Sequence, residues 1–239
     1  MDKEQFQKLV DYVTSPDAYF TYPKVLFSEG FESWTNRTSL AQALRRNRIQ
    51  DLNPVLELYH SVVNEPVADP IDINTKIMVY WDLSSCIWKA EQDGDKAIHY
   101  LDLAIELAES IETHVLTLAK GQLWFNRWQL LSFSNRAKQA IMEADQKIAE
   151  HQPGLPGNSY LHYAYLFKAE ILKETDIDTA LEFLYKALQY FPDEHNNLDR
   201  LEELWMNRES DKEKTFTEIE KLTHFTVCWD IPDSFWSSI

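Results

Sequence analysis

The sequence predicts an all-α protein in which about 9 to 11 helices stack as antiparallel hairpins. The chain of 239 residues has only 5 glycines, too few for a β-rich fold with many tight turns. Leu, Ala, Glu, Lys and Gln dominate long stretches, and these residue types favour helix. Apolar residues also recur at helical spacing, and one such apolar face is repeated along the chain.

Prolines and short polar clusters divide residues 1–72 into helix-length pieces. Asn53-Pro54 is a good helix beginning, because asparagine caps a helix and proline has no N–H group to leave unpaired. We expect these pieces to form an N-terminal helical cap. The expected elements are helices at 3–14, at 38–49 (capped by Thr38) and at 53–64, short irregular helices at 18–36, and a candidate degenerate repeat at 38–64.

Residues 73–192 form an almost continuous helical pattern with short breaks, which predicts three helical hairpins. After Pro192, residues 193–239 are expected to contain C-terminal capping helices and a non-helical aromatic tail. The expected breaks lie at 92–94, near Ser110, at 132–134, at 151–159 and at 174–176, and the expected capping helices lie at 196–208 and 213–224.

The apolar face of residues 178–192, DTALEFLYKALQYFP, recurs earlier in the chain. All six of its apolar positions are apolar again 83 residues earlier, and four of the six are apolar 40 residues earlier. Its small residues, Ala180 and Ala187, would let two helices approach closely while the larger ones fill the groove between them. The alternative is a helical bundle without repeats, in which these are ordinary core faces. The six positions are Ala180, Leu181, Leu184, Ala187, Leu188 and Phe191.

A tryptophan stands sixteen residues before the first small position in two of the three units. Trp81 precedes Ala97 and Trp124 precedes Ala140 at this spacing, whereas the third unit has Ala164 in the aromatic position. This phasing indicates a first helix that precedes each closing helix, so that the repeated unit is a hairpin.

DKAIHYLDLAIEL (95–107) and DTALEFLYKALQYFP (178–192) resemble the second helix of a tetratricopeptide repeat. The resemblance implies a right-handed solenoid of helical hairpins over 73–192 that binds proteins or peptides. Departures from the family pattern are Lys147 at a small position, Ala164 at the aromatic position, and units longer than the family's usual length of about 34 residues. Longer units of this kind are similar to those of bacterial Rap-type peptide receptors.

The chain is strongly acidic, with a formal net charge of −16. Such a chain repels phosphate backbones, so we expect no nucleic acid as its main ligand. The acidity either keeps the protein in solution or forms a surface for a basic partner.

Two cysteines, no basic apolar leader and no long apolar run predict a cytoplasmic protein without a membrane segment. Acids concentrate at 93–112 and 193–220, whereas RRNR (45–48) is a basic cluster for which a helix-turn-helix interpretation is conceivable.

The first helix of each hairpin would line the concave face of the solenoid, where amides and aromatic side chains suit a peptide. The alternative for each of these residues is solvation, or burial beneath a neighbouring helix. A family set of Lys, Asn and Arg that grips a terminal carboxylate is matched in part by Lys89, Asn126 and Lys173. The candidate binding residues are Asp82, Lys89, Gln122, Phe125, Asn126, Gln129, His162, Tyr165 and Lys173, with Val79, Cys86 and Ala169 beside them in the same register.

Catalytic motifs are missing from the sequence, and we expect no cofactor. Glu57 and His60 have the spacing of helical di-iron ligands, but a second copy is lacking, so a metal site is not expected.

The sequence leaves three hypotheses for function. The first hypothesis is a non-enzymatic protein- or peptide-binding module, in one version an immunity or antitoxin-like protein that neutralises a basic partner. The second is a peptide-sensing regulator of the Rap type, and the third a helical metal-dependent enzyme.

Overall fold

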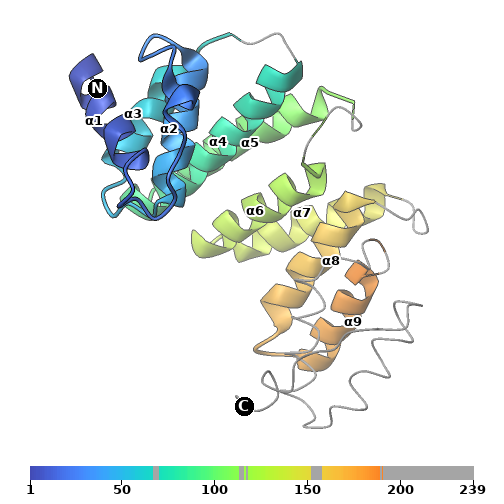
Figure 1. Ribbon diagram of the computed structural model, residues 1–239. Coiled ribbons are helices and arrows are strands. Elements are labelled where there is room, and N and C mark those ends of the chain that lie inside the picture. The colour runs from blue at the N-terminus through green and yellow to red at the C-terminus, as the bar shows by residue number, and fades with distance from the viewer. Residues whose placement is uncertain (67–69, 113–115, 117, 152–157, 189, 191–239) are drawn as a thin grey trace, which may run out of the picture. The chain divides into compact units, whose positions relative to one another are not determined.

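The computed structural model describes residues 1–66, 70–112, 116, 118–151, 158–188 and 190 (Figure 1). All the regular secondary structure in these residues is helical, which confirms the predicted all-α class. The chain forms two compact units, Met1–Ala137 and Lys138–Ile239. The expected capping helices and aromatic tail of 193–239 lie outside the described residues.

In the first unit, each helix packs against the next one along the chain, as in helical repeat proteins. The pairs α1·α2, α2·α3, α3·α4, α4·α5 and α5·α6 are all in contact, and the 3₁₀ turn η1 packs on α2. The elements are α1 (Lys3–Val13), η1 (Lys24–Phe27), α2 (Trp34–Arg46), α3 (Asn53–Val62), α4 (Pro70–Glu91), α5 (Gly94–Glu109) and α6 (Lys120–Phe133).

The second unit contains nearly all of α7 (Ala137–Glu150), together with α8 (Ser159–Leu172) and α9 (Ile177–Leu188). Helices α8 and α9 pack closely against each other. Ala180 and Ala187 on α9 are fully buried, so these small residues do serve close packing as the sequence predicts.

Helices end near each expected break between residues 92 and 176, although α6 continues to Phe133 and residues 152–157 lie outside the described residues. Gln92 and Asn135 follow the ends of α4 and α6 with φ of 55° and 60°, the left-handed conformation that ends a helix. Asn158 caps α8 by accepting hydrogen bonds from the backbone N–H groups of the first turn. Local turn chemistry therefore sets these boundaries.

The predicted beginnings of α2 and α3 are wrong in detail. Ser33 caps α2 by accepting from the Asn36 N–H at 3.3 Å, and Thr38 lies buried inside the helix. Asn53 is already a helical residue of α3, and its N–H donates to the Asp51 carboxylate at 3.0 Å. Several cap-forming residue types stand close together here, and burial of one helix face decides which of them acts as the cap.

Candidate functional site

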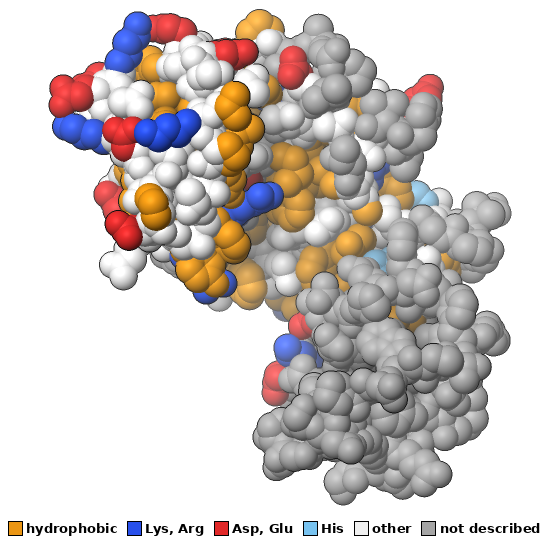
Figure 2. All heavy atoms as spheres, in the orientation of Figure 1, with side chains coloured by type: hydrophobic (Ala, Val, Ile, Leu, Met, Phe, Trp, Pro, Cys, Tyr) orange, Lys and Arg blue, Asp and Glu red, His pale blue; other side chains and the backbone are white. Residues whose placement is uncertain are grey.

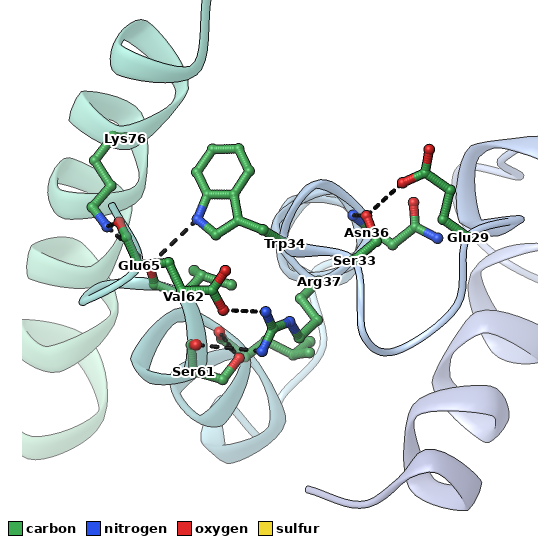
Figure 3. A network of polar contacts seen from close by, with 10 residues as sticks. Glu29, Ser33, Trp34, Asn36, Arg37, Ser61, Val62, Glu65 and Lys76 are labelled. Carbon is green, nitrogen blue, oxygen red and sulfur yellow. Dashed lines mark hydrogen bonds and ion pairs between the residues drawn. The ribbon is translucent and has the colours of Figure 1, made fainter. Parts of the chain in front are cut away.

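The N-terminal half of α2 is fixed to α3 and α4 by hydrogen bonds to the last carbonyls of α3 (Figure 3). Trp34 donates from Nε1 to the Val62 carbonyl at 3.3 Å, and Lys76 donates from Nζ to the same carbonyl at 2.9 Å. Lys76 also donates to the Glu65 carbonyl at 2.7 Å. These bonds satisfy carbonyl groups that a helix end leaves without intrahelical partners.

Both cations of this network contact oxygen atoms, although the buried Nε atom of Arg37 has no hydrogen-bond partner. Arg37 forms an ion pair with the Glu65 carboxylate and donates to the Ser61 carbonyl at 3.4 Å. Lys76 is only 4% exposed, and burial lowers the pKa of its ammonium group, opposed by the charge of Glu65. The network therefore holds α2, α3 and α4 together, and Arg37 and Lys76 serve to stabilise the fold and not to bind a ligand.

The C-terminal end of α2 is ordered by its buried cap residue, Asn47. Its Nδ2 atom donates to the Ala43 carbonyl at 2.9 Å and to the Phe20 carbonyl at 3.1 Å, and its Oδ1 atom accepts from the Phe20 N–H at 2.9 Å. Arg48 follows with φ of 53°, so the chain turns sharply away from the helix. Asn47 thus fixes both the turn after α2 and a segment before it.

A cavity of about 560 Å³ lies between this turn and α4. Its walls combine cations, amides and apolar side chains. Of the described residues that line it, four are cations and one, Asp82, is an acid. The lining consists of Gln42, Arg45, Arg46, Arg48, Ile49, Gln50, Leu52, Met78, Asp82, Ser85, Cys86 and Lys89.

The carboxylate of Asp82 is already used within the protein. It forms an ion pair with Arg45 and accepts a hydrogen bond from the Tyr59 hydroxyl at 2.9 Å. Tyr59 is fully buried, and burial raises the pKa of its phenol although the Arg45 charge opposes the shift. The phenol therefore stays protonated and donates to Asp82, which neutralises Arg45 and no other cation of the pocket.

The other three cations of the pocket are not ion-paired. Across the described part of the chain, no carboxylate lies within ion-pair distance of Arg46, Arg48 or Lys89. The first unit's arginines outside the pocket, Arg37, Arg127 and Arg136, all pair with a carboxylate. Unpaired positive charge is thus concentrated at this pocket, which can attract an anionic group.

The acids of α5 are partly occupied by cations that follow them in the chain. Asp95 pairs with Arg136 at 2.9 Å and Asp102 with Arg127 at 2.5 Å. Glu109 lies 3.7 Å from the ammonium group of Lys120. Figure 2 shows acidic and basic side chains intermingled over the N-terminal helices as well. Three acids of the run 93–112 therefore have cationic neighbours within the protein.

Two of the candidate residues predicted from the sequence meet in the pocket. Asp82 and Lys89 both lie on α4 and both line the cavity. Their neighbour Cys86 also lines it and is 2% exposed, and burial raises the pKa of its thiol. Val79 is fully buried, so this position is a core position and does not face a groove.

The candidates on α6 lie elsewhere in the first unit, and none of them lines the cavity. Phe125 is 7% exposed and belongs to the core, which corrects its assignment to an open face. Asn126 donates from Nδ2 to the Gln122 carbonyl one turn earlier, at 2.7 Å. Gln122, Asn126 and Gln129 are all half-buried.

The candidates on α8 belong to the second unit. His162 is fully buried, and its Nδ1 atom is 2.8 Å from the Ala187 carbonyl, which makes it a contact between α8 and α9 and corrects its assignment to a groove. Tyr165 is half-buried and stacks on Phe183, with ring centroids 6.1 Å apart. Lys173 is exposed and pairs with Glu170 at 3.2 Å. Ala169, like His162, is buried. Buried residues lie around much of α8, so helical spacing does not separate a buried side from an exposed side.

The arginines of the pocket were not among the predicted binding residues. The RRNR run was visible as a basic cluster in an acidic chain, and that was the available signal. Its importance depends on which arginine is paired, and the partner of Arg45 lies on α4, far along the chain.

The Glu57-x-x-His60 pair has other contacts in the fold. Glu57 lies 3.1 Å from the amino group of Met1, and His60 contacts the ring of Tyr100 with centroids 6.0 Å apart. In the residues that the structure places, no three His, Cys, Asp or Glu side chains gather closely enough to hold a metal ion. Nor does any helix among them have the length and apolar character needed to cross a bilayer.

Comparisons of the chain with protein-family models, with curated proteins and with solved structures found no match. The resemblance to tetratricopeptide repeats and to Rap-type receptors therefore stays a prediction. The pocket between α2 and α4 is the feature of the described residues that best suits a ligand.

Proposed function

We propose that this chain is a non-enzymatic helical binding protein whose pocket takes an anionic group of a peptide or protein partner. The observation that carries this proposal is the convergence of Arg46, Arg48 and Lys89, all without ion-pair partners among the described residues, on one cavity. The chain has 39 acidic and 23 basic residues, so carboxylates are abundant as partners. Cations that stay unpaired in such a chain are available to a ligand.

The chemistry of these side chains suits recognition of carboxylates. A guanidinium group presents a planar fork of donors that matches the two oxygens of a carboxylate, and charged hydrogen bonds are about twice as strong as neutral ones. Arg45 is held in place by its ion pair with Asp82, so it lines the pocket but its charge is already compensated. The mutual repulsion of the remaining cations is relieved when an anion binds.

A peptide fits the remaining walls better than a nucleic acid. Gln42 and Gln50 offer amide groups for a peptide backbone, and Leu52 and Met78 offer apolar contact for side chains. The overall charge of −16 opposes a nucleic-acid backbone more than a short acidic peptide, because the nucleic acid carries a negative charge on every nucleotide. The ligand is therefore an anionic group carried by a peptide or protein segment.

The two other binding hypotheses make different use of the molecule. An immunity-like protein would use its acids on a basic partner, but three acids of α5 are engaged by Lys120, Arg127 and Arg136. The second acidic run, 193–220, lies outside the described residues. A peptide-responsive regulator would use the same pocket and would also require the helices to rearrange when the peptide binds.

Affinity capture with three forms of the protein tests the proposal. The forms are the wild type, the variant with Arg46→Gln and Arg48→Gln, and the control Lys24→Gln, which changes an exposed lysine outside the pocket lining. We expect mass spectrometry to find partners that the wild type and the control retain and the double variant loses, with retention falling as salt increases. Retention of the same partners by all three forms would contradict a role of the pocket.

A further inference from the structure

Two exposed aromatic side chains lie beside the pocket. Tyr19 and Phe20 are 64% and 51% exposed, and their rings contact each other edge to face with centroids 4.7 Å apart. Large apolar side chains exposed together in this way are typical of binding surfaces when they are held in a fixed position.

The pair is fixed to the rim of the pocket by two contacts. The backbone of Phe20 exchanges two hydrogen bonds with the side chain of Asn47, at 2.9 and 3.1 Å. The guanidinium group of Arg48 lies over the Tyr19 ring, 5.1 Å from its centroid. Because Arg48 also lines the cavity, the aromatic pair and the cationic pocket share a residue and are continuous.

The number of cations indicates a ligand with more than one negative charge. Arg46, Arg48 and Lys89 carry three positive charges that Asp82 does not compensate, since its carboxylate is paired with Arg45. A single carboxylate, such as a peptide's terminus, would leave two of these charges without a partner. Neighbouring acidic side chains would compensate more of them at a favourable distance.

We infer that the pocket and the Tyr19–Phe20 pair form one recognition surface for a peptide segment in which neighbouring acidic residues stand beside an aromatic or large aliphatic residue. This inference rests on the proposed function and specifies the partner's chemistry. The acidic side chains bind Arg46, Arg48 and Lys89, and the apolar side chain packs on the two exposed rings. Fixed aromatic rings lose little conformational freedom when they bind, which makes them effective contacts.

The test uses three synthetic peptides with amidated C-termini, studied by isothermal titration calorimetry. The first contains Glu-Asp-Asp followed by Phe-Ile. The second replaces Phe-Ile by Ser-Ser, and the third replaces the acids by Gln-Asn-Asn. Amidation removes the terminal carboxylate, so binding has to use side chains. We expect the first peptide to bind about tenfold more tightly than the second, and the third not to bind.

Protein variants separate the two parts of the surface. Tyr19→Ser with Phe20→Ser should make the first peptide bind as weakly as the second, because the contact to Asn47 uses the backbone of Phe20 and survives. The matched control is Val25→Ser with Leu26→Ser, two exposed apolar residues on η1 that do not line the cavity. This control should bind both peptides as the wild type does, and circular dichroism should show that all variants are folded.

The outcomes distinguish the inference from the proposed function. If the first and second peptides bind equally well, the aromatic pair plays no part, and the inference is overturned while an anion-binding pocket stands. If the peptides bind only with a free C-terminal carboxylate, the requirement for neighbouring acids is wrong. If no acidic peptide binds, amidated or not, the proposed function fails as well. Binding that appears only as the protein dimerises would identify a second copy as the occupant and would also overturn the inference.

Discussion

The two ends of helix α2 use arginine in different ways. Near its beginning, Arg37 pairs with Glu65 and joins the network that satisfies the last carbonyls of α3. At its end, Arg45 is paired with Asp82, whereas Arg46 and Arg48 have no carboxylate partner in the described residues. The same residue type therefore holds helices together at one end and lines an open pocket at the other.

This difference shows that the pairing of cations is more informative than their position in the sequence. A cation that is buried and satisfied contributes to stability, and its removal leaves polar groups without partners. A cation that is exposed and unpaired contributes little to stability and is available to a ligand. Substitutions at the two ends of α2 should therefore affect different properties of the protein.

The largest effect on stability is expected from Lys76→Met, in the network near the beginning of α2. The change removes two hydrogen bonds and leaves the carbonyls of Val62 and Glu65 with fewer donors. We expect the free energy of unfolding in urea to fall by about 2 to 3 kcal/mol. Lys24→Met, at an exposed position, should change it by less than about 0.5 kcal/mol. Equal effects of the two substitutions would show that the buried Lys76 contributes no more to stability than an exposed lysine.

A smaller loss is expected from Asp82→Asn, which lies in the pocket. The free energy of unfolding should fall by about 1 to 2 kcal/mol, because Arg45 loses its carboxylate partner. Binding of the acidic and aromatic peptide should become about three- to tenfold tighter, since a negative charge leaves the site. Tyr59→Phe removes the hydrogen bond to Asp82 and keeps the charge, so its affinity should stay unchanged. Weaker binding by Asp82→Asn would show instead that this carboxylate contacts the ligand directly.

Much of the fold was predictable because helix ends depend on local residues. The breaks after Glu91 and Phe133 follow from polar residues that adopt left-handed backbone conformations, and the buried alanines of α9 follow from helical spacing. The beginning of α2 was predicted wrongly because Ser33 and Thr38 are both capable caps. Packing against the rest of the unit decides between them, and the local sequence does not contain that information.

The pocket was predictable only in part. Asp82 and Lys89 were recognised from their position on the first helix of a hairpin, and the basic run at 45–48 was visible. The position of Asp82 on α4 decides that Arg45 has a carboxylate partner and Arg46 has none among the described residues. That position depends on how distant segments pack, which the local sequence does not show. Phe125 and His162 were assigned to open faces because α6 and α8 bury broad surfaces, and helical spacing then gives little indication of which side faces solvent.

A smaller, pH-dependent effect is expected from His60, in the last turn of α3. His60 is exposed, but partial desolvation lowers the pKa of its imidazole, and the charge of Lys96 lowers it further, opposed by Glu91. The unfolded chain therefore takes up the proton more readily, so the contribution to stability is present above about pH 6.5 and lost as the pH falls.

Urea unfolding at pH 7.5 and at pH 5.5 measures this contribution. The wild type should lose more stability between the two values than His60→Gln, which has no imidazole to protonate. An equal loss in the two proteins would show that His60 is as easily protonated in the folded chain as in the unfolded one.

The smallest effect on stability and the largest on binding are expected from Arg46→Gln with Arg48→Gln. Neither side chain has an ion-pair partner in the described residues, so the free energy of unfolding should stay within about 0.5 kcal/mol of the wild type. Titration calorimetry of this double variant with the acidic and aromatic peptide measures how much Arg46 and Arg48 contribute to binding. The pocket as described predicts a loss of affinity of about 100-fold or more. An affinity within about twofold of the wild type would contradict it, because two charged contacts cannot be removed from a binding site at so small a cost.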